Sequence, residues 1–294
     1  MKICSFTESQ QSRLGILEEK ATNRVLDIGS SDSRTFSSFQ SLLEESRRSK
    51  IGPEELLNNA LSEGNLGTLD LQKISLNIPL VPPEVWGAGV TYMQSRDARE
   101  VETNLKGLYK YVYDAKRPEI FFKTTGLRCV GPEQEISIRS DSKWSVPEPE
   151  LGVVFGHDFS IIGYTIGNDV SSRDIEGENA LYLPQAKIFK NCCSLGPFVT
   201  TPDEIPDPRS LRIRMKITRG GAAVFQGETS TSKMKRSIEE LVSYLRSNNE
   251  LPAGSVLITG TGIVPPDDFS LRDRDEVEIE IEKIGTLRNR VKQL

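Results

Sequence analysis

The chain has 294 residues, of which 36% are hydrophobic, and a formal net charge of −5 at pH 7. This length allows a large buried core in one or two domains, and the negative charge provides no basic surface for nucleic acid. No stretch approaches the roughly 18 apolar residues of a transmembrane helix, and the first residues lack the apolar core of a signal peptide. We therefore expect a cytoplasmic protein that binds neither membranes nor nucleic acid.

The few cysteines and the single histidine limit which kinds of catalytic and metal site are possible. The 4 cysteines include no C-x-x-C pair, which favours reduced thiols. The 1 histidine, His157, falls in a predicted turn and is expected to lie on the surface. A Ser–His or Cys–His catalytic pair is therefore not expected elsewhere, and a zinc site with several histidines is impossible.

Residues 1–75 predict a small α/β domain. A β-hairpin is expected before two helices. Thr35 can cap the first helix, whose apolar side chains recur at helical spacing, and Pro53 fits the first position of the second. No candidate chemistry appears in this segment, so we expect the functional site in residues 76–294.

Residues 89–95, Gly-Val-Thr-Tyr-Met-Gln-Ser, precede a polar segment, residues 96–117, that we expect to form a mobile lid. Arg96 and Arg99 in this segment could bind a substrate carboxylate, or could be solvated surface charges. A strand is predicted at residues 118–123. Its Glu119 could be an acid or base at the site, or a strand-end carboxylate in water.

Three carboxylates are expected to converge further along the chain. Glu148 and Glu150 are two residues apart on a predicted strand, so both side chains point to one face, about 7 Å apart. If the hairpin that follows turns at residue 158, Asp169 lies nearly opposite Glu148. Converging carboxylates repel one another, so either a cation neutralises them or one has a raised pKa. Oxygen ligands favour Mg²⁺ or Mn²⁺ over Zn²⁺; the alternative is a solvated acidic strand edge.

Two later segments carry further candidates. Lys187 could hold an enolate oxygen or, if burial lowers its pKa, act as a base. Residues 260–262, Gly-Thr-Gly, follow a predicted strand, where backbone N–H groups and the Thr261 hydroxyl could approach a ligand; a tight turn is the alternative. Alternating apolar residues elsewhere indicate many strands and few helices. These patterns predict an α+β fold built on a mostly antiparallel β-sheet roll.

Several motifs in this order resemble the signature of the fumarylacetoacetate hydrolase family. They are Val146-Pro-Glu-Pro-Glu150, Gly163-Tyr-Thr-Ile-Gly-Asn-Asp169, Ser172-Arg-Asp174, Leu251-Pro-Ala-Gly-Ser-Val-Leu-Ile-Thr-Gly-Thr-Gly262 and Ile284-Gly-Thr-Leu-Arg-Asn289. The resemblance implies a small α/β domain (1–75) before a catalytic domain (76–294). It also implies that Glu148, Glu150 and Asp169 bind Mg²⁺, with Mn²⁺ as an alternative, and that the protein forms a homodimer or higher homo-oligomer.

The sequence departs from the family's hydrolases at one motif. They typically carry Gly-x-Asn-Tyr-x-x-His, in which the histidine activates water for carbon–carbon bond cleavage. This chain has Thr91 in place of the asparagine and Ser95 in place of the histidine. Serine without a partner is not a base near pH 7. The departure puts hydrolysis of an acylpyruvate or a fumarylacetoacetate-type substrate in doubt.

Residues 174–187 and 260–266 resemble the branch of the family that dehydrates 2-keto-3-deoxy sugar acids. This resemblance implies a hydro-lyase that converts a 2-keto acid such as 2-keto-3-deoxy-arabinonate to 2,5-dioxopentanoate through a metal-stabilised enolate. We expect Lys187 and Glu119 to be the acid and base, in either order. The residues expected to contact substrate are Ser95, Arg96, Glu176 and Thr261. The alternatives are a carbon–carbon bond hydrolase and a catalytically silent binding protein.

Overall fold

The computed structural model describes residues 1–294 except residue 9 and residues 19–22, 63–65 and 103–106. The strands of its large sheet are β1 (Lys2–Glu8), β2 (Gln11–Leu17), β3 (Arg24–Asp27), β4 (Gly67–Asp70), β5 (Leu76–Asn77), β6 (Val85–Gly89), β7 (Glu119–Thr124), β8 (Cys129–Val130), β11 (Pro149–Phe155), β12 (Ile161–Asp169), β14 (Cys193–Thr200) and β17 (Val256–Ile258). A second sheet contains β9 (Glu135–Ile138), β15 (Arg212–Arg219), β16 (Ala222–Ser230), β18 (Glu276–Ile281) and β19 (Gly285–Gln293). A short pair is formed by β10 (Ser145–Val146) and β13 (Ser171–Ser172).

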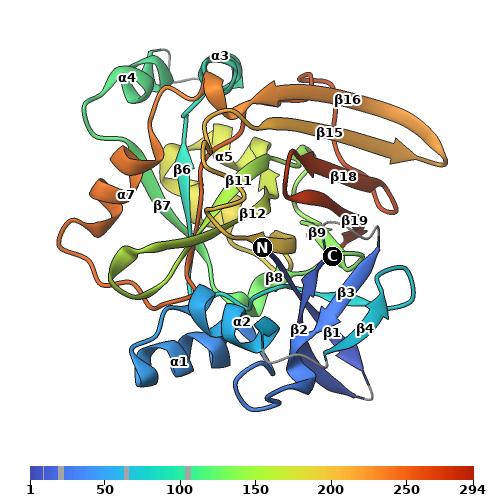
Figure 1. Ribbon diagram of the computed structural model, residues 1–294. Coiled ribbons are helices and arrows are strands. Elements are labelled where there is room, and N and C mark those ends of the chain that lie inside the picture. The colour runs from blue at the N-terminus through green and yellow to red at the C-terminus, as the bar shows by residue number, and fades with distance from the viewer. Residues whose placement is uncertain (9, 19–22, 63–65, 103–106) are drawn as a thin grey trace.

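Of the described helices labelled in Figure 1, α5 lies in the middle of the view and the others lie nearer its edges. The described α-helices are α1 (Phe39–Ser49), α2 (Pro53–Ser62), α3 (Met93–Glu102), α4 (Leu108–Asp114), α5 (Arg173–Glu178), α6 (Leu183–Lys187) and α7 (Ile238–Arg246). In Figure 1, α3 and α4 are at the top of the view and α1 and α2 at the bottom. None of the described helices is long and apolar enough to cross a membrane.

The predicted α+β fold with mostly antiparallel sheets is confirmed. The main path of the large sheet runs β4-β3-β2-β1-β14-β12-β11-β17-β6-β7, and the second runs β16-β15-β18-β19-β9. Parallel pairing among the described strands is confined to β17–β6, β8–β14 and β19–β9. The alternating sequence of β15 explains its burial, because Ile213, Met215 and Ile217 face the core while charged residues between them face solvent.

The N-terminal helices follow the sequence closely, with one correction. The first helix begins at Phe39, not beside Thr35, because Ser38 is the N-cap and its hydroxyl accepts a hydrogen bond from the Ser41 amide at 3.1 Å. The second helix begins at Pro53 as predicted. Strand β1, which the sequence analysis did not identify, pairs with both β2 and β14. Residues 1–75 therefore share a sheet with the remainder of the chain, and the domain boundary at residue 75 stays a prediction.

The β11–β12 hairpin places the predicted metal ligands. Its register pairs Pro149 with Asn168, and the Asp169 amide donates a hydrogen bond to the Glu148 carbonyl at 3.0 Å. Asp169 therefore lies opposite Glu148, as predicted. All of β11 is buried between β12 and β17. His157 lies in the turn of the hairpin, partly exposed, with its Nε2 3.2 Å from the Leu43 carbonyl oxygen.

Candidate active site

A small cavity lies where β6, β7, β11 and the end of β12 meet α3, α5 and α6. It gathers nearly all of the residues that the sequence predicted for the site. Those lining it are Ser95, Glu119, Glu148, Glu150, Asp169, Glu176, Lys187 and Thr261. Arg96 does not line it and Arg99 does.

The three predicted metal ligands form one buried carboxylate cluster. Glu148 and Glu150 project from the same face of β11 and Asp169 ends β12, and one oxygen from each lies within 4.8 Å of the others. Their exposed fractions are 3%, 3% and 1%. Buried carboxylates this close are unfavourable without a compensating cation, and hard oxygen donors suit Mg²⁺ or Mn²⁺. The donor set therefore fits a divalent metal ion.

Glu150 is the carboxylate whose charge is least compensated. Burial raises its pKa well above the usual value, and repulsion from Asp169 and Glu148 adds to this effect. It accepts a hydrogen bond from the Gly260 amide at 2.6 Å. Gly260 has a φ of +91°, and a Cβ there would overlap the Thr91 hydroxyl. The Gly-Thr-Gly segment thus does more than turn the chain, because it brings a backbone donor to a candidate metal ligand.

Lys187 lies against the other two carboxylates. Its Nζ donates hydrogen bonds to Glu148 Oε2 at 2.9 Å, Asp169 Oδ2 at 3.0 Å and Ser171 Oγ at 2.6 Å. Burial alone would lower the pKa of Lys187, but the charges of Asp169 and Glu148 outweigh it and raise the pKa. Burial would raise the pKa of Glu148, yet the charges of Lys187, Arg173 and Arg99 outweigh it and lower the pKa.

Helix α3 brings Arg99, rather than Arg96, to the site. Ser95 and Arg99 are four residues apart and lie on one buried face of the helix. The Arg99 guanidinium pairs with Glu148 at 2.9 Å and also with Glu176. Arg96 is rotated onto another face, where it pairs with Asp97 at 2.5 Å and lies over the Tyr113 ring. The prediction that Arg96 contacts substrate is therefore corrected, because the helical repeat turns it away from the cavity.

Glu119 reaches the cavity from the start of β7. In the β6–β7 pair it lies opposite Gly89, where a Cβ would overlap its carboxylate, so only glycine leaves room for it. Burial raises the pKa of Glu119, and the nearby charge of Glu176 raises it further. Burial would also raise the pKa of Glu176, but the charges of Arg99, Lys187 and Arg173 together outweigh burial and lower the pKa.

Two buried cations at the site were given no catalytic or binding role from the sequence. Arg173 begins α5 and pairs with Glu148 at 2.8 Å, and Lys123 of β7 lies 2.5 Å from Asp169 Oδ1. Each stands inside a recognisable motif, Ser-Arg-Asp and Pro-x-x-Phe-x-Lys, but spacing along a chain does not reveal which carboxylate a cation will meet.

The charges at the site leave one negative charge uncompensated. The described residues here include five carboxylates, from Glu119, Glu148, Glu150, Asp169 and Glu176, and four cations, from Arg99, Lys123, Arg173 and Lys187. With every group ionised, a divalent metal ion together with a monoanionic 2-keto acid would bring the total to zero. Electroneutrality in a buried site is energetically favourable. The charge balance therefore suits this pair of ligands.

We expect metal binding to release protons. Glu150 and Glu119 have pKa values above the ordinary 4.5, so their protonated forms stabilise the metal-free fold at low pH, and this stabilisation is lost as pH rises above 4.5. Glu148 has the opposite effect, because its pKa is lowered. Its ionised form stabilises the fold above pH 4.5, and this stabilisation is lost as pH falls below 4.5 toward the lowered pKa.

A divalent ion must displace the proton on Glu150, so the apparent affinity for Mn²⁺ should rise as pH rises above 4.5, the ordinary pKa of a glutamate carboxyl. Titration calorimetry in two buffers of different ionisation enthalpy measures the protons released. An affinity that does not change with pH, together with heats independent of buffer, would contradict this prediction.

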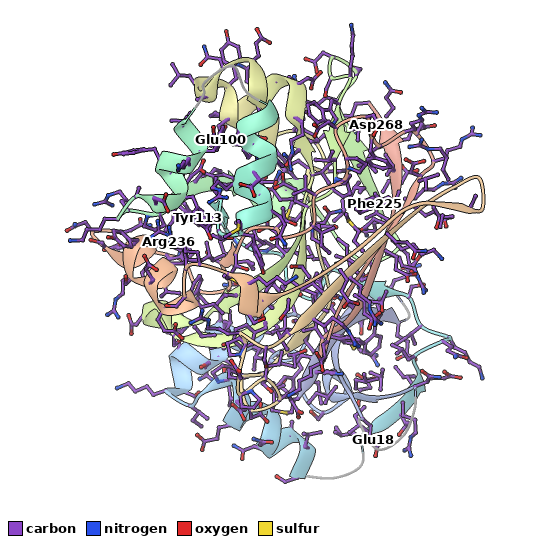
Figure 2. All side chains as sticks on the ribbon, turned by 90° about the horizontal axis from the view of Figure 1, so that it is seen from above. Glu18, Glu100, Tyr113, Phe225, Arg236 and Asp268 are labelled. Carbon is purple, nitrogen blue, oxygen red and sulfur yellow. The ribbon has the colours of Figure 1, made fainter. Side chains whose placement is uncertain are left out.

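The segment expected to form a lid consists of α3 and α4, with residues 103–106 between them outside the described part of the chain. Its C-terminal end is held by two neighbouring cations. Lys235 donates to the Tyr113 carbonyl at 2.7 Å, and Arg236 donates to the same carbonyl at 3.3 Å. Figure 2 shows Tyr113 and Arg236 side by side in this region. The helices that close the cavity are thus attached to the segment before α7.

The site is that of a metal-dependent enzyme with a carboxylate triad and a lysine in one cavity. Residues 84–292 of the chain match the C-terminal domain of fumarylacetoacetate (FAA) hydrolase. The chain therefore belongs to the fumarylacetoacetate hydrolase family.

Three similar proteins are informative. A probable 2-keto-3-deoxyxylonate dehydratase of Haloferax volcanii is 52% identical over 214 residues, covering 73% of this chain and 74% of that protein. A 2-dehydro-3-deoxy-D-arabinonate dehydratase of Saccharolobus solfataricus is 50% identical over 233 residues, 78% of each chain. A solved structure of 2-keto-3-deoxy-D-arabinonate dehydratase complexed with magnesium and 2,5-dioxopentanoate is 40% identical, has a TM-score of 0.83, and matches 100% of this chain and 99% of that one.

Proposed function

We propose that this protein is a Mg²⁺-dependent hydro-lyase that dehydrates a 2-keto-3-deoxy sugar acid, with 2-keto-3-deoxy-arabinonate giving 2,5-dioxopentanoate and water. The observation that carries the proposal is one cavity that joins the carboxylate triad to Lys187 and Glu119. The two dehydratases at about half identity support the reaction, and the magnesium and 2,5-dioxopentanoate in the solved relative support the metal and product.

We assign the residues of the cavity to metal binding, proton removal and proton donation. Glu148, Glu150 and Asp169 would hold the metal ion. Bound Mg²⁺ would supply Lewis acidity toward the keto oxygen of the substrate and a positive charge that favours the neutral form of Lys187. We assign the removal of a C3 proton to Lys187. Glu119, whose raised pKa keeps a proton available, would donate that proton to the departing C4 hydroxyl.

The remaining steps need only proton transfers. Loss of water leaves a double bond between C3 and C4, beside the C5 alcohol. Removal of a C5 proton and protonation of C3 then give an enol between C4 and C5, which becomes the C5 aldehyde when C4 is protonated. Ser95, Glu176 and Thr261 line the same cavity and are proposed to contact the substrate.

The hydrolase alternative has less support from the site. Ser95 occupies the position at which the family's hydrolases carry their histidine, and it is buried in the cavity wall. His157 is in the turn at the far end of the β11–β12 hairpin and does not line the cavity. No imidazole is therefore present to activate water, and dehydration consumes none.

The test is to incubate the protein and Mg²⁺ with a panel of 2-keto-3-deoxy acids and acylpyruvates, and to follow the products by mass. We expect loss of one water from a 2-keto-3-deoxy acid and slow or absent turnover of acylpyruvates. In D₂O the product should carry solvent deuterium at C3 and C4. Brisk cleavage of acylpyruvates without any dehydration would reject the proposal in favour of a hydrolase.

We also infer a cytoplasmic homodimer or higher homo-oligomer. The cysteines Cys4, Cys129, Cys192 and Cys193 are all free thiols, which suits a reducing compartment. The oligomeric state rests on resemblance to the family. Light scattering during size-exclusion chromatography tests it, and a monomer at micromolar concentration would refute it.

A further inference from the structure

Lys123 is a fully buried ammonium group behind the active site. Its exposed fraction is 0%, and it does not line the cavity. Its Nζ donates to the Val170 carbonyl at 3.0 Å and to the Lys187 carbonyl at 2.5 Å, and lies 2.5 Å from Asp169 Oδ1. The two carbonyls accept hydrogen bonds from the ammonium group, and the contact with Asp169 is an ion pair.

The partners of Lys123 belong to the two elements that carry the chemistry. Asp169 and Val170 are at the end of β12, whereas Lys187 is the last residue of α6. Helix α6 has 5 residues, and a helix of one turn or so has little stability of its own. The position of Lys187 relative to Asp169 therefore depends on tertiary contacts, and Lys123 bridges the two directly.

Lys187 is consequently held from both sides. Its side chain faces the cavity and donates to Glu148 and Asp169, while its carbonyl accepts from Lys123 behind. Burying an ammonium group is costly, and apolar side chains of similar volume often stabilise a core as well or better. Such a residue is better explained by the geometry that it imposes than by stability.

We propose that Lys123 is a positioning residue that fixes Lys187 relative to Asp169 by binding the Asp169 carboxylate and the Lys187 carbonyl together. Lys123 does not line the cavity, and it acts through Asp169, a proposed metal ligand, and through Lys187. The inference rests on the proposed function only for the role of Lys187 in the chemistry, and the structural part of the test does not depend on activity.

The first test is Lys123→Met, which keeps the side-chain length but removes the donors and the charge. Hydrogen exchange followed by mass spectrometry should show faster exchange in the peptide that contains residues 183–188. The matched control is Lys190→Met, because Lys190 is exposed and close to α6 in sequence, and it should leave this exchange unchanged. Unchanged exchange in Lys123→Met would overturn the proposal, whatever reaction the protein catalyses.

Kinetics and metal binding provide the second test. In Lys123→Met we expect kcat to fall by roughly 10²-fold with KM nearly unchanged, the scale associated with a small misplacement of a catalytic group. The Mn²⁺ dissociation constant should stay the same or decrease, because a neighbouring positive charge has been removed. A merely structural role would instead weaken Mn²⁺ binding together with the melting temperature, and that result would overturn the proposal.

A double-mutant cycle separates this inference from the proposed function. If Lys123 acts through Lys187, the variant carrying both Lys123→Met and Lys187→Met should be no slower than Lys187→Met alone. Additive losses would overturn the positioning role. Full activity in Lys187→Met would reject the proposed mechanism but leave the exchange test of Lys123 valid. If Lys123→Met does not fold, Lys123→Gln replaces it, since the amide retains donors without the charge.

Discussion

Lys187→Met is expected to lower kcat by about 10²-fold or more, the range that a general acid–base group supplies. The substitution keeps the side-chain length but removes the ammonium group that donates to Glu148, Asp169 and Ser171. Steady-state kinetics with a 2-keto-3-deoxy acid and saturating Mg²⁺ measure this loss. Wild-type kcat in the variant would exclude Lys187 from the chemistry.

The same variant should separate chemistry from folding. Without metal, Lys187→Met removes a cation from two buried carboxylates, so the melting temperature of the metal-free protein should fall. Mg²⁺ or Mn²⁺ restores positive charge at the carboxylates, and the melting temperature should recover while kcat does not. Recovery of both would show that Lys187 contributes charge compensation alone.

Glu150→Gln is expected to have the largest effect on metal binding. The substitution removes a candidate ligand charge but retains an oxygen that can accept from the Gly260 amide. The Mn²⁺ affinity should fall at least about 10²-fold, more than is typical for loss of an outer-shell group, and Mg²⁺-dependent turnover should be lost. Titration calorimetry and activity assays after chelation and metal readdition measure both quantities.

The stability of the metal-free protein should distinguish Glu150→Gln from Glu148→Gln. The described residues provide no lysine or arginine ion pair to Glu150, whereas Glu148 pairs with Arg99, Arg173 and Lys187. Glu150→Gln should therefore leave the melting temperature of the metal-free protein unchanged or raise it. Glu148→Gln, the matched control, should destabilise the fold by about 3–5 kcal/mol, the usual cost of breaking a buried pair. Equal destabilisation by both substitutions would contradict this assignment of charges.

The sequence by itself determined many of the elements and the convergence of the three carboxylates, because both depend on local periodicity. Alternation along β15, the proline that begins α2 and the N-cap of α7 are short-range properties; the Ser237 hydroxyl, for example, accepts a hydrogen bond from the Glu240 amide three residues later. The triad followed from the two-residue repeat of a strand and the position of one turn, and the hairpin register places Asp169 opposite Glu148. The absence of a histidine at residue 95 could likewise be read directly from the chain.

Only the tertiary structure decided which charges meet. Whether Arg96 or Arg99 faces the site depends on the rotation of α3 about its axis, which is set by how the helix packs. Arg99, Lys123 and Arg173 come from three distant segments, and their pairing with Glu148, Glu176 and Asp169 is set by how those segments pack. The pKa values of Glu119, Glu150 and Lys187 follow from that packing, since burial and neighbouring charge act through space and leave no mark on the order of residues.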